Sequence, residues 1–380
     1  MNPGNQPPST LNLPRVLFAA GALSALASEL DALGIHRPLL VTDQGLVAAG
    51  LATKAIAACG KAAPAVFDCV TENPLFIDVD SGAAWYAQQG CDGVLALGGG
   101  SVIDTAKMIA LLATNPGSVA NYAGVRNAVH GPSAPLIVIP TTAGTGSEAS
   151  PSAGIHPDAV TASVGMNSRH LVPKLAILDP DLTRSLPARL TAATGVDALS
   201  HCIEGFLSKK DIPLGKSIAL DGIARVARYL RRAVTNRDDV QARGEMMLAA
   251  FAGGAAIGMG LGPAHAIAIV CSDQGFHHGL LSGIGLVATL DATSAHVPEL
   301  AAEVALALGL GRTESLGQAV ARLMRELGLP ATLAELNYVP RDLQTLADAA
   351  HQSHFNLFAP FHPTASDYAV MFASSLRKNS

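Results

Sequence analysis

Residues 93–112 read GVLALGGGSVIDTAKMIALL and carry a short apolar run, a glycine-rich turn and a helical pattern in direct succession. Gly93–Leu97 predicts a buried strand, and Val102–Leu112 has the periodicity of a helix. The turn between them consists of Gly98, Gly99, Gly100 and Ser101. Glycines let the backbone approach a pyrophosphate closely, and the first N–H groups of a helix bind anions. The stretch predicts a dinucleotide site, with an ordinary glycine-rich turn as the alternative.

The alternation of apolar runs and helical patterns extends on both sides of this turn. Further buried strands are predicted at Pro38–Asp43, Ala65–Val70, Pro135–Pro140 and Leu175–Leu178, and further helices at Leu23–Leu33 and Gln44–Cys59. Strands that alternate with helices predict a largely parallel α/β sheet.

The pattern changes near residue 184. Helical spacing then prevails at Ala188–Ser208, Pro213–Arg232, Val240–Gly258, His265–Ser272, Glu299–Leu308, Glu314–Gly328 and Asp342–His351. The chain has 380 residues, more than the roughly 250–300 residues that one hydrophobic core serves. We therefore predict an α/β dinucleotide-binding domain at residues 1–184 and an all-helical domain at residues 185–380.

Hydroxyl groups follow the strand predicted at Pro135–Pro140. The next residues, Thr141–Glu148, read TTAGTGSE. The carboxyl ends of parallel strands form the crevice where such sheets bind ligands, so Thr141, Thr142 and Thr145 are candidate contacts to phosphate, ribose or nicotinamide. The alternative is a hydroxyl cap on the next helix, but one cap does not require four hydroxyl side chains.

Asp43 closes another predicted strand. A carboxylate at this place can accept hydrogen bonds from both ribose hydroxyls and would repel a 2′-phosphate, which favours NAD over NADP. Asp43 can equally cap the N-terminus of the helix predicted at Gln44–Cys59. The residues alone leave both interpretations open.

The helical half contains a candidate metal site. Asp197 and His201 lie four residues apart in a predicted helix and so project from one face. His265 and one of the pair His277-His278 would complete a site with one carboxylate and three imidazoles, suited to Fe(II) or Zn(II). Each histidine alone is more often a hydrogen-bonded core or surface residue, and spacing does not show that the four meet in space.

Composition excludes several classes of partner. The net charge is −5 and no run of Lys or Arg stands out, so neither nucleic acid nor an anionic membrane surface is an expected partner. Five scattered cysteines without a CxxC pair predict free thiols and a cytoplasmic protein. Residues 246–272 lack a charged side chain, but five glycines, Pro263 and His265 favour buried helices over a membrane span.

Four motifs in one order resemble the iron-containing (group III) alcohol dehydrogenases. They are Gly98–Ser101 with Asp104 and Lys107, then TTAGTGSE at 141–148, then Leu178-Asp179-Pro180, then TGVDALSHCIE at 194–204. The resemblance runs from about residue 14 to about residue 330. It implies the two-domain architecture shared with dehydroquinate synthase, an active site between the domains, and a homodimer that pairs through an N-terminal strand.

The resemblance also implies residue roles. The metal ligands of the family fall on Asp197, His201, His265 and His278, its NAD-selecting carboxylate on Asp43, and its cofactor contacts on Gly99, Gly100, Ser101, Thr141, Thr142 and Thr145. This chain departs from the family at Ile269, where many members have a proton-handling histidine, and at Ser163, where a lysine is common. The ligand spacing also leaves His277 open as an alternative to His278.

The hypothesis is therefore a metal-dependent oxidoreductase that transfers hydride between NAD(H) and a small alcohol or aldehyde, with one divalent ion, Fe(II) before Zn(II). Because Ile269 cannot carry a proton, the proton is expected to leave through water, the ribose hydroxyl or His277, and His277 is the candidate catalytic residue. A metal-independent reductase of the maleylacetate reductase type is the nearest alternative. Two further alternatives are a dehydroquinate-synthase-like lyase and a cofactor-binding protein that has lost catalysis.

Overall fold

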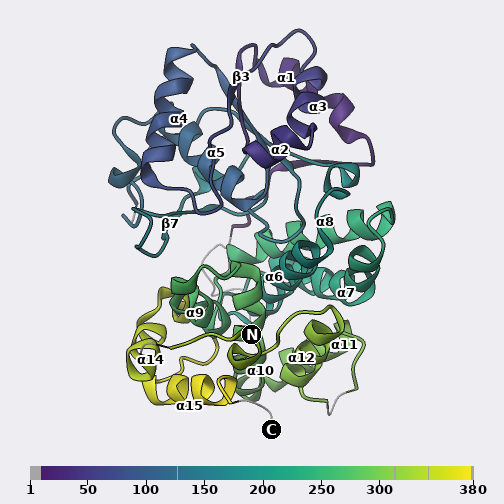
Figure 1. Cartoon of the computed structure of the whole chain (residues 1–380), viewed down its shortest axis with the longest axis vertical. Helices are drawn as coiled ribbons and strands as arrows, with labels where there is room; N and C mark the ends of the chain where they lie inside the picture. Colours follow the sequence, from purple (N-terminus) through teal and green to yellow (C-terminus); the bar gives the residue numbers. More distant parts are fainter. Residues whose placement is uncertain (1–9, 126, 312–313, 341, 378–380) are drawn as a thin grey trace, which may run out of the picture.

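A computed structural model describes residues 10–125, 127–311, 314–340 and 342–377. The N-terminal part is an α/β unit, drawn in purple to blue in Figure 1, and the remainder is a helical unit in green to yellow. The last strand of the large sheet ends at Leu178, and the first long helix of the second unit begins at Ala188. We propose residue 184, between these two points, as the domain boundary.

The α/β unit is built on a parallel sheet of six strands. These are β1 (Arg15–Phe18), β2 (Pro38–Val41), β3 (Ala65–Phe67), β4 (Gly93–Gly98), β5 (Leu136–Pro140) and β8 (Leu175–Leu178). Their order is β1-β8-β5-β4-β2-β3, and every neighbouring pair is parallel. From β2 the chain moves outward to β3, whereas from β4 it moves the other way to β5. The topological switch point of the sheet therefore lies between β2 and β4.

Helices cover both faces of this sheet. Alternate residues such as Leu40 and Leu95 pack under α1 (Leu26–Leu33) and α3 (Leu51–Ala58). The intervening residues, such as Leu39 and Val94, pack under α4 (Phe76–Gln88) and α5 (Gly100–Leu112). Because both faces are buried, the central strands are continuous apolar runs in the sequence. These runs made the strands predictable.

Other elements of this unit differ from prediction. The helix expected at 44–59 is divided into α2 (Gln44–Ala48) and α3, because Gly50 between them has a φ of 75° that ends the first helix. The helix α4, the edge strand β1 and the antiparallel hairpin of β6 (Ser152–Ile155) and β7 (Val164–Asn167) were not predicted. Short 3₁₀ turns lie at Ala22–Ala25, Val119–Asn121, Arg169–Leu171 and Pro180–Thr183.

The helical unit begins with three long helices, α6 (Ala188–Leu207), α7 (Pro213–Thr235) and α8 (Val240–Ile257). They are followed by α9 (Pro263–Val270), α10 (His278–His296), α11 (Pro298–Ala307), α12 (Leu316–Glu326), α13 (Leu333–Leu336), α14 (Leu343–Gln352) and α15 (Ala365–Ser375), with 3₁₀ turns at Ser272–Gln274 and His354–Phe358. The sequence predicted seven of these helices, but not α10, α13 or α15.

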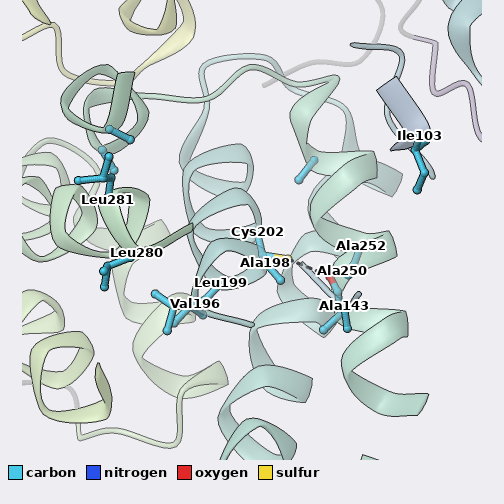
Figure 2. Packing of buried hydrophobic residues seen from close by; sticks show 14 of the residues in the cluster. Ile103, Ala143, Val196, Ala198, Leu199, Cys202, Ala250, Ala252, Leu280 and Leu281 are labelled. Atoms are coloured by element: carbon cyan, nitrogen blue, oxygen red, sulfur yellow. Dashed lines mark hydrogen bonds between the residues drawn. The ribbon is translucent and has the colours of Figure 1, made fainter. Parts of the chain in front are cut away.

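The helix α6 lies at the centre of the unit. Figure 2 shows Ala198 and Cys202 on the side of α6 that faces α8, and Val196 and Leu199 toward α10. Small residues bring the helices close: a Cβ added at Gly205 would lie 2.5 Å from the Cβ of Ala256. Of the 20 residues of α6, all from Thr191 onward are buried, so the polar side chains of this part of the helix are largely shielded from bulk water.

The uncharged stretch 246–272 is divided in the structure. It contains the end of α8, a turn at residues 258–262 and the whole of α9. Within the described ranges, no helix is long and apolar enough to cross a membrane.

Candidate functional site

Three residues predicted as metal ligands meet at the centre of the helical unit. Asp197 and His201 project from one face of α6, and His265 comes from the first turn of α9. One possible ligand atom from each residue lies within 4.8 Å of the other two. The Nε2 atoms of His201 and His265 are each 4.0 Å from Oδ1 of Asp197. All three side chains are buried, so they form a compact mixed O/N donor set.

Neighbouring side chains fix the orientation of two of these residues. The Ser282 hydroxyl of α10 donates a hydrogen bond to Oδ1 of Asp197 at 2.7 Å. Nδ1 of His265 lies 2.5 Å from Oε2 of Glu204, a buried carboxylate of α6. The rings of His201 and His265 stack, with their centroids 4.7 Å apart. Neither Ser282 nor Glu204 was predicted to take part in the site. The one signal for Glu204 in the sequence is a glutamate about one turn after His201 in a mostly apolar helix.

The donor set fits a cation. Among the described residues, Nε2 of His265 faces Oδ1 of Asp197 and is buried without a hydrogen-bond partner, which is costly unless another group binds there. Burial lowers the pKa of His201 to about 4. Burial alone would raise the pKa of Asp197, but the imidazoles of His201, His278 and His265 lower it to about 2. At neutral pH the site therefore presents a carboxylate and a neutral imidazole, the forms that bind metals.

The pair His277-His278 lies at the start of α10. The His278 ring is 5.6 Å from the ring of His265, and its charge lowers the pKa of Asp197. Nδ1 of His277 instead accepts a hydrogen bond from the N–H of Gly279 at 3.1 Å, as an N-cap of the helix. The structure therefore brings His278 beside the cluster, although it is not one of the three residues within 4.8 Å.

A glycine allows this approach of α10 to α6. A Cβ added at Gly279 would lie 2.9 Å from the Cβ of Asp197 and 2.6 Å from the carbonyl oxygen of Ala193. Any side chain at this position would push the first turn of α10, and His278 with it, away from Asp197.

The predicted dinucleotide residues gather at the carboxyl edge of the sheet. Asp43 follows β2, Gly98–Ser101 ends β4 and begins α5, and Thr141–Thr145 follows β5. Because β2, β4 and β5 are parallel neighbours, all three segments lie at one edge, at or beside the switch point. The N-terminus of α5 has no side-chain cap, so its first N–H groups are available to an anion.

The two loops at this edge fit directly against each other. A Cβ added at Gly100 would lie 2.7 Å from Cγ2 of Thr145, and one at Gly99 would lie 3.2 Å from Cγ2 of Thr142. The glycines are therefore required by the packing of the threonine loop as well as by access to a ligand. The Ser101 hydroxyl donates to the carbonyl oxygen of Glu72, and Thr141 is buried.

Asp43 adopts the capping role that the sequence left open. Its Oδ1 accepts a hydrogen bond from the N–H of Leu46 at 2.9 Å, at the start of α2. Its side chain is partly exposed at the sheet edge. The cap and a contact to a ribose are compatible, because a carboxylate can accept several hydrogen bonds at once.

The threonine loop also touches the metal helix. A Cβ at Gly144 would lie 2.4 Å from the Cβ of Thr194, which is three residues before Asp197 on α6. Gly146 similarly packs against Gly254 of α8. The loop that follows β5 thus joins the dinucleotide edge to α6 and α8, and α6 carries two residues of the cluster.

A buried charged cluster holds this loop to α5. The Lys107 ammonium donates to the carbonyl oxygens of Ser150 at 2.9 Å and Ser152 at 2.6 Å, and it is 4.0 Å from Asp104. Burial lowers the pKa of Lys107 to about 8 and raises the pKa of the neighbouring Glu148 to about 7. In the sequence, Lys107 was only one member of a motif. In the structure, it links α5 to the carbonyl oxygens of Ser150 and Ser152.

Two apolar side chains lie near His265, beside its polar partners. The ring of Phe355 lies 5.7 Å from the His265 ring, and Ile269 follows one turn later on α9 with partial exposure. Neither side chain can transfer a proton. Position 269, where many family members have a histidine, therefore cannot serve this purpose in this chain.

Comparison with known proteins agrees with this geometry. The family model described as iron-containing alcohol dehydrogenase matches residues 14–180, and the model of the C-terminal domain of that family matches residues 191–376. A 4-hydroxybutyrate dehydrogenase of Cupriavidus necator is 40% identical over 369 residues, covering 94% of this chain and 96% of the relative.

Two solved structures have the same architecture. A 1,3-propanediol oxidoreductase has a TM-score of 0.91 at 30% identity, covering 96% of this chain and 99% of its own. A sulfoacetaldehyde reductase of Bifidobacterium kashiwanohense, in complex with NAD⁺, has a TM-score of 0.89 at 28% identity, covering 97% and 98%.

The two family models together cover nearly the whole chain, one matching the α/β unit and the other the helical unit that contains the Asp197-His201-His265 cluster. The chain belongs to the iron-containing alcohol dehydrogenase family and is an NAD-linked oxidoreductase.

Proposed function

We propose that Asp197, His201, His265 and His278 hold one divalent metal ion, Fe(II) in preference to Zn(II). The observation that supports this most is the buried cluster of three ligand atoms, in which Nε2 of His265 faces Asp197 without a hydrogen-bond partner. His278 adds a fourth donor because Gly279 lets it approach Asp197. His277 caps α10 with its Nδ1, which favours His278 over His277 as the ligand. When bound, the ion would polarise the oxygen of the substrate.

The dinucleotide is proposed to bind at the carboxyl edge of the sheet. Contacts to it come from the turn Gly98, Gly99, Gly100 and Ser101, from Thr141, Thr142 and Thr145, and from Asp43. The uncapped N-terminus of α5 binds the pyrophosphate through backbone N–H groups. The free oxygen of Asp43 accepts from the ribose hydroxyls, and its charge disfavours a 2′-phosphate.

The proton of the alcohol is proposed to leave through His277. Its Nδ1 accepts from the N–H of Gly279, so Nε2 carries the hydrogen in the neutral ring. The ring takes up the alcohol proton at the Nδ1 lone pair when the contact to Gly279 opens, and Nε2 then releases its own hydrogen. Ile269 cannot do so. His277 is partly exposed, so the proton can pass on to water.

The substrate is proposed to be a short primary alcohol or its aldehyde, because Phe355 and Ile269 offer apolar surface beside the metal ligands. The similarity to a 4-hydroxybutyrate dehydrogenase makes a short ω-hydroxy acid the second candidate. Steady-state rates of NAD⁺ reduction with ethanol, 1-butanol, 1,3-propanediol and 4-hydroxybutyrate distinguish the two. A preference of kcat/KM for the neutral alcohols supports the first, and a preference for the hydroxy acid supports the second.

A homodimer in the cytoplasm is proposed as the working form. In the part of the chain that the structure describes, the edge strand β1 pairs only with β8, and its residues Val16 and Phe18 are 38% and 42% exposed. An open strand edge with apolar side chains is suited to pairing with a second copy. All five cysteines are free, as a reducing compartment would keep them. Light scattering coupled to gel filtration tests the dimer.

The test of the function combines metal analysis with turnover. Protein purified without chelator is expected to contain about one equivalent of Fe or Zn and to oxidise NADH with an aldehyde. Chelation should abolish the turnover, and added metal should restore it. Full turnover by metal-free protein would instead assign the chain to the metal-independent reductases of the maleylacetate reductase type.

A further inference from the structure

Glu204 is a buried carboxylate to which the proposed mechanism assigns no task. It lies on α6, three residues after His201, and is 7% exposed. Its two oxygens have different partners. Oε2 lies 2.5 Å from Nδ1 of His265, and Oε1 accepts the N–H of Ala264 at 2.7 Å. A carboxylate so deeply buried is expected to have a specific partner. Glu204 has two, and both belong to α9.

The first of these tasks is to cap α9. The N-cap residue of α9 is Gly262, which has no side chain, and Pro263 at the first position has no N–H. The N–H of Ala264 is therefore the first one that needs an acceptor, and Glu204 supplies it from another helix. A Cβ added at Gly262 would lie 2.8 Å from Oε1 of Glu204, so the glycine makes room for this carboxylate.

The second task concerns the tautomer of His265. An ionised carboxylate only accepts hydrogen bonds, so Nδ1 must carry the hydrogen. Nε2 then has a free lone pair. That atom is buried without a partner among the described residues and lies 4.0 Å from Oδ1 of Asp197. The hydrogen bond to Glu204 thus turns the imidazole into a ligand aimed at the cluster.

We propose that Glu204 is a positioning residue for the metal site, which fixes His265 as an Nε2 ligand and adds a second negative charge beside the cation. Together with Asp197 it brings two carboxylates to a site for a divalent ion. This inference rests on the proposed metal site. A role of Glu204 restricted to capping α9 is the alternative that the experiment must separate.

The test measures the affinity for Co²⁺ in wild type and E204Q by competition with a chelator and by the visible absorption of the bound ion. Glutamine keeps the shape of the side chain, but it removes the charge and can accept from only one of the two N–H groups. Removal of such an orienting partner typically weakens metal binding by about 10–100-fold, and we expect a loss in this range.

A matched control is E335Q. The Glu335 carboxylate also accepts a backbone N–H, that of Ala331 at 2.8 Å, but it bonds Arg325 rather than a cluster residue. We expect E335Q to bind Co²⁺ like wild type, whatever its effect on thermal stability. If E204Q also binds Co²⁺ like wild type and only its metal-free melting temperature falls, Glu204 is a helix cap and the inference is wrong.

A second measurement does not depend on whether E204Q folds. In metal-free wild type labelled with ¹⁵N-histidine, NMR should show His265 protonated on Nδ1, with its signals assigned by their loss in H265N. Protonation on Nε2 would overturn the inference. If wild type itself binds no Co²⁺, the proposed metal site fails, and this outcome is distinct from a failure confined to Glu204.

Discussion

The two halves of the site are built in different ways. The dinucleotide edge consists mainly of backbone, in loops that directly follow β4 and β5, and its geometry depends on glycines that leave room for threonines. The proposed metal site combines side chains of α6 and α9 with His278 of α10, and only tertiary packing brings these together. We therefore expect substitutions in the cluster to weaken metal binding and substitutions at the sheet edge to weaken cofactor binding. Each kind of substitution should have little effect on the other binding property.

The largest effect is expected from H201A. Loss of this buried ligand should remove the metal and lower kcat by more than about 1000-fold, because polarisation of the substrate oxygen contributes several kcal/mol. NADH binding, followed by its fluorescence, should change little because the sheet edge is intact. A metal-free H201A with full activity would contradict the assignment.

A smaller effect on the other half is expected from G100A. The added methyl would lie 2.7 Å from Cγ2 of Thr145, so one loop must move, and we expect KM for NAD(H) to rise by about 10-fold, or about 1.4 kcal/mol. Metal content should remain at the wild-type value.

G165A is the control, since a Cβ at Gly165 would meet nothing within 4 Å. If G100A lost metal as well as cofactor affinity, the two halves would not be independent.

D43N separates the two roles of Asp43. Asparagine is as good an N-cap as aspartate, so the bond to the N–H of Leu46 is kept while the charge is lost. We expect the ratio of kcat/KM for NAD⁺ over NADP⁺ to fall by about 10-fold, because one repulsive charge near the 2′-phosphate is removed. An unchanged ratio would leave Asp43 with the capping role alone.

The smallest effect on catalysis, and a distinct effect on stability, is expected from E148Q. Burial raises the pKa of Glu148 from 4.5 to about 7, so between these values the folded state binds more protons than the unfolded state. The contribution of Glu148 to the free energy of unfolding is thus fully present below pH 4.5. It is lost as the pH rises through 7, and the total loss is about 3 kcal/mol. The urea midpoint of wild type should fall across this window, and E148Q should flatten the decrease. A parallel decrease in E148Q would assign it to other groups.

The contrast between the halves also explains what the sequence could predict. Strands such as Gly93–Gly98 are local apolar runs buried on both faces, and the turns after them follow in the chain, so the dinucleotide edge was predicted from pattern alone. The break at Gly50 was missed because a glycine inside a helical pattern does not reveal its φ, which is 75° here.

The metal cluster was less accessible to such reasoning. Asp197 and His201 share a helix face, and spacing alone predicts that pair. The approach of His278 depends on α10, a helix that was not predicted, and on the small size of Gly279. The bond from Glu204 to His265 joins residues 61 positions apart, and no local pattern records it.

The most direct test of the central claim is an anomalous difference map at the iron or zinc absorption edge, from crystals of active enzyme purified without chelator. We expect one peak per chain, bound by Asp197, His201, His265 and Nε2 or Nδ1 of His278. No peak at this cluster in crystals of fully active protein, or a peak bound by His277 in place of His278, would contradict it.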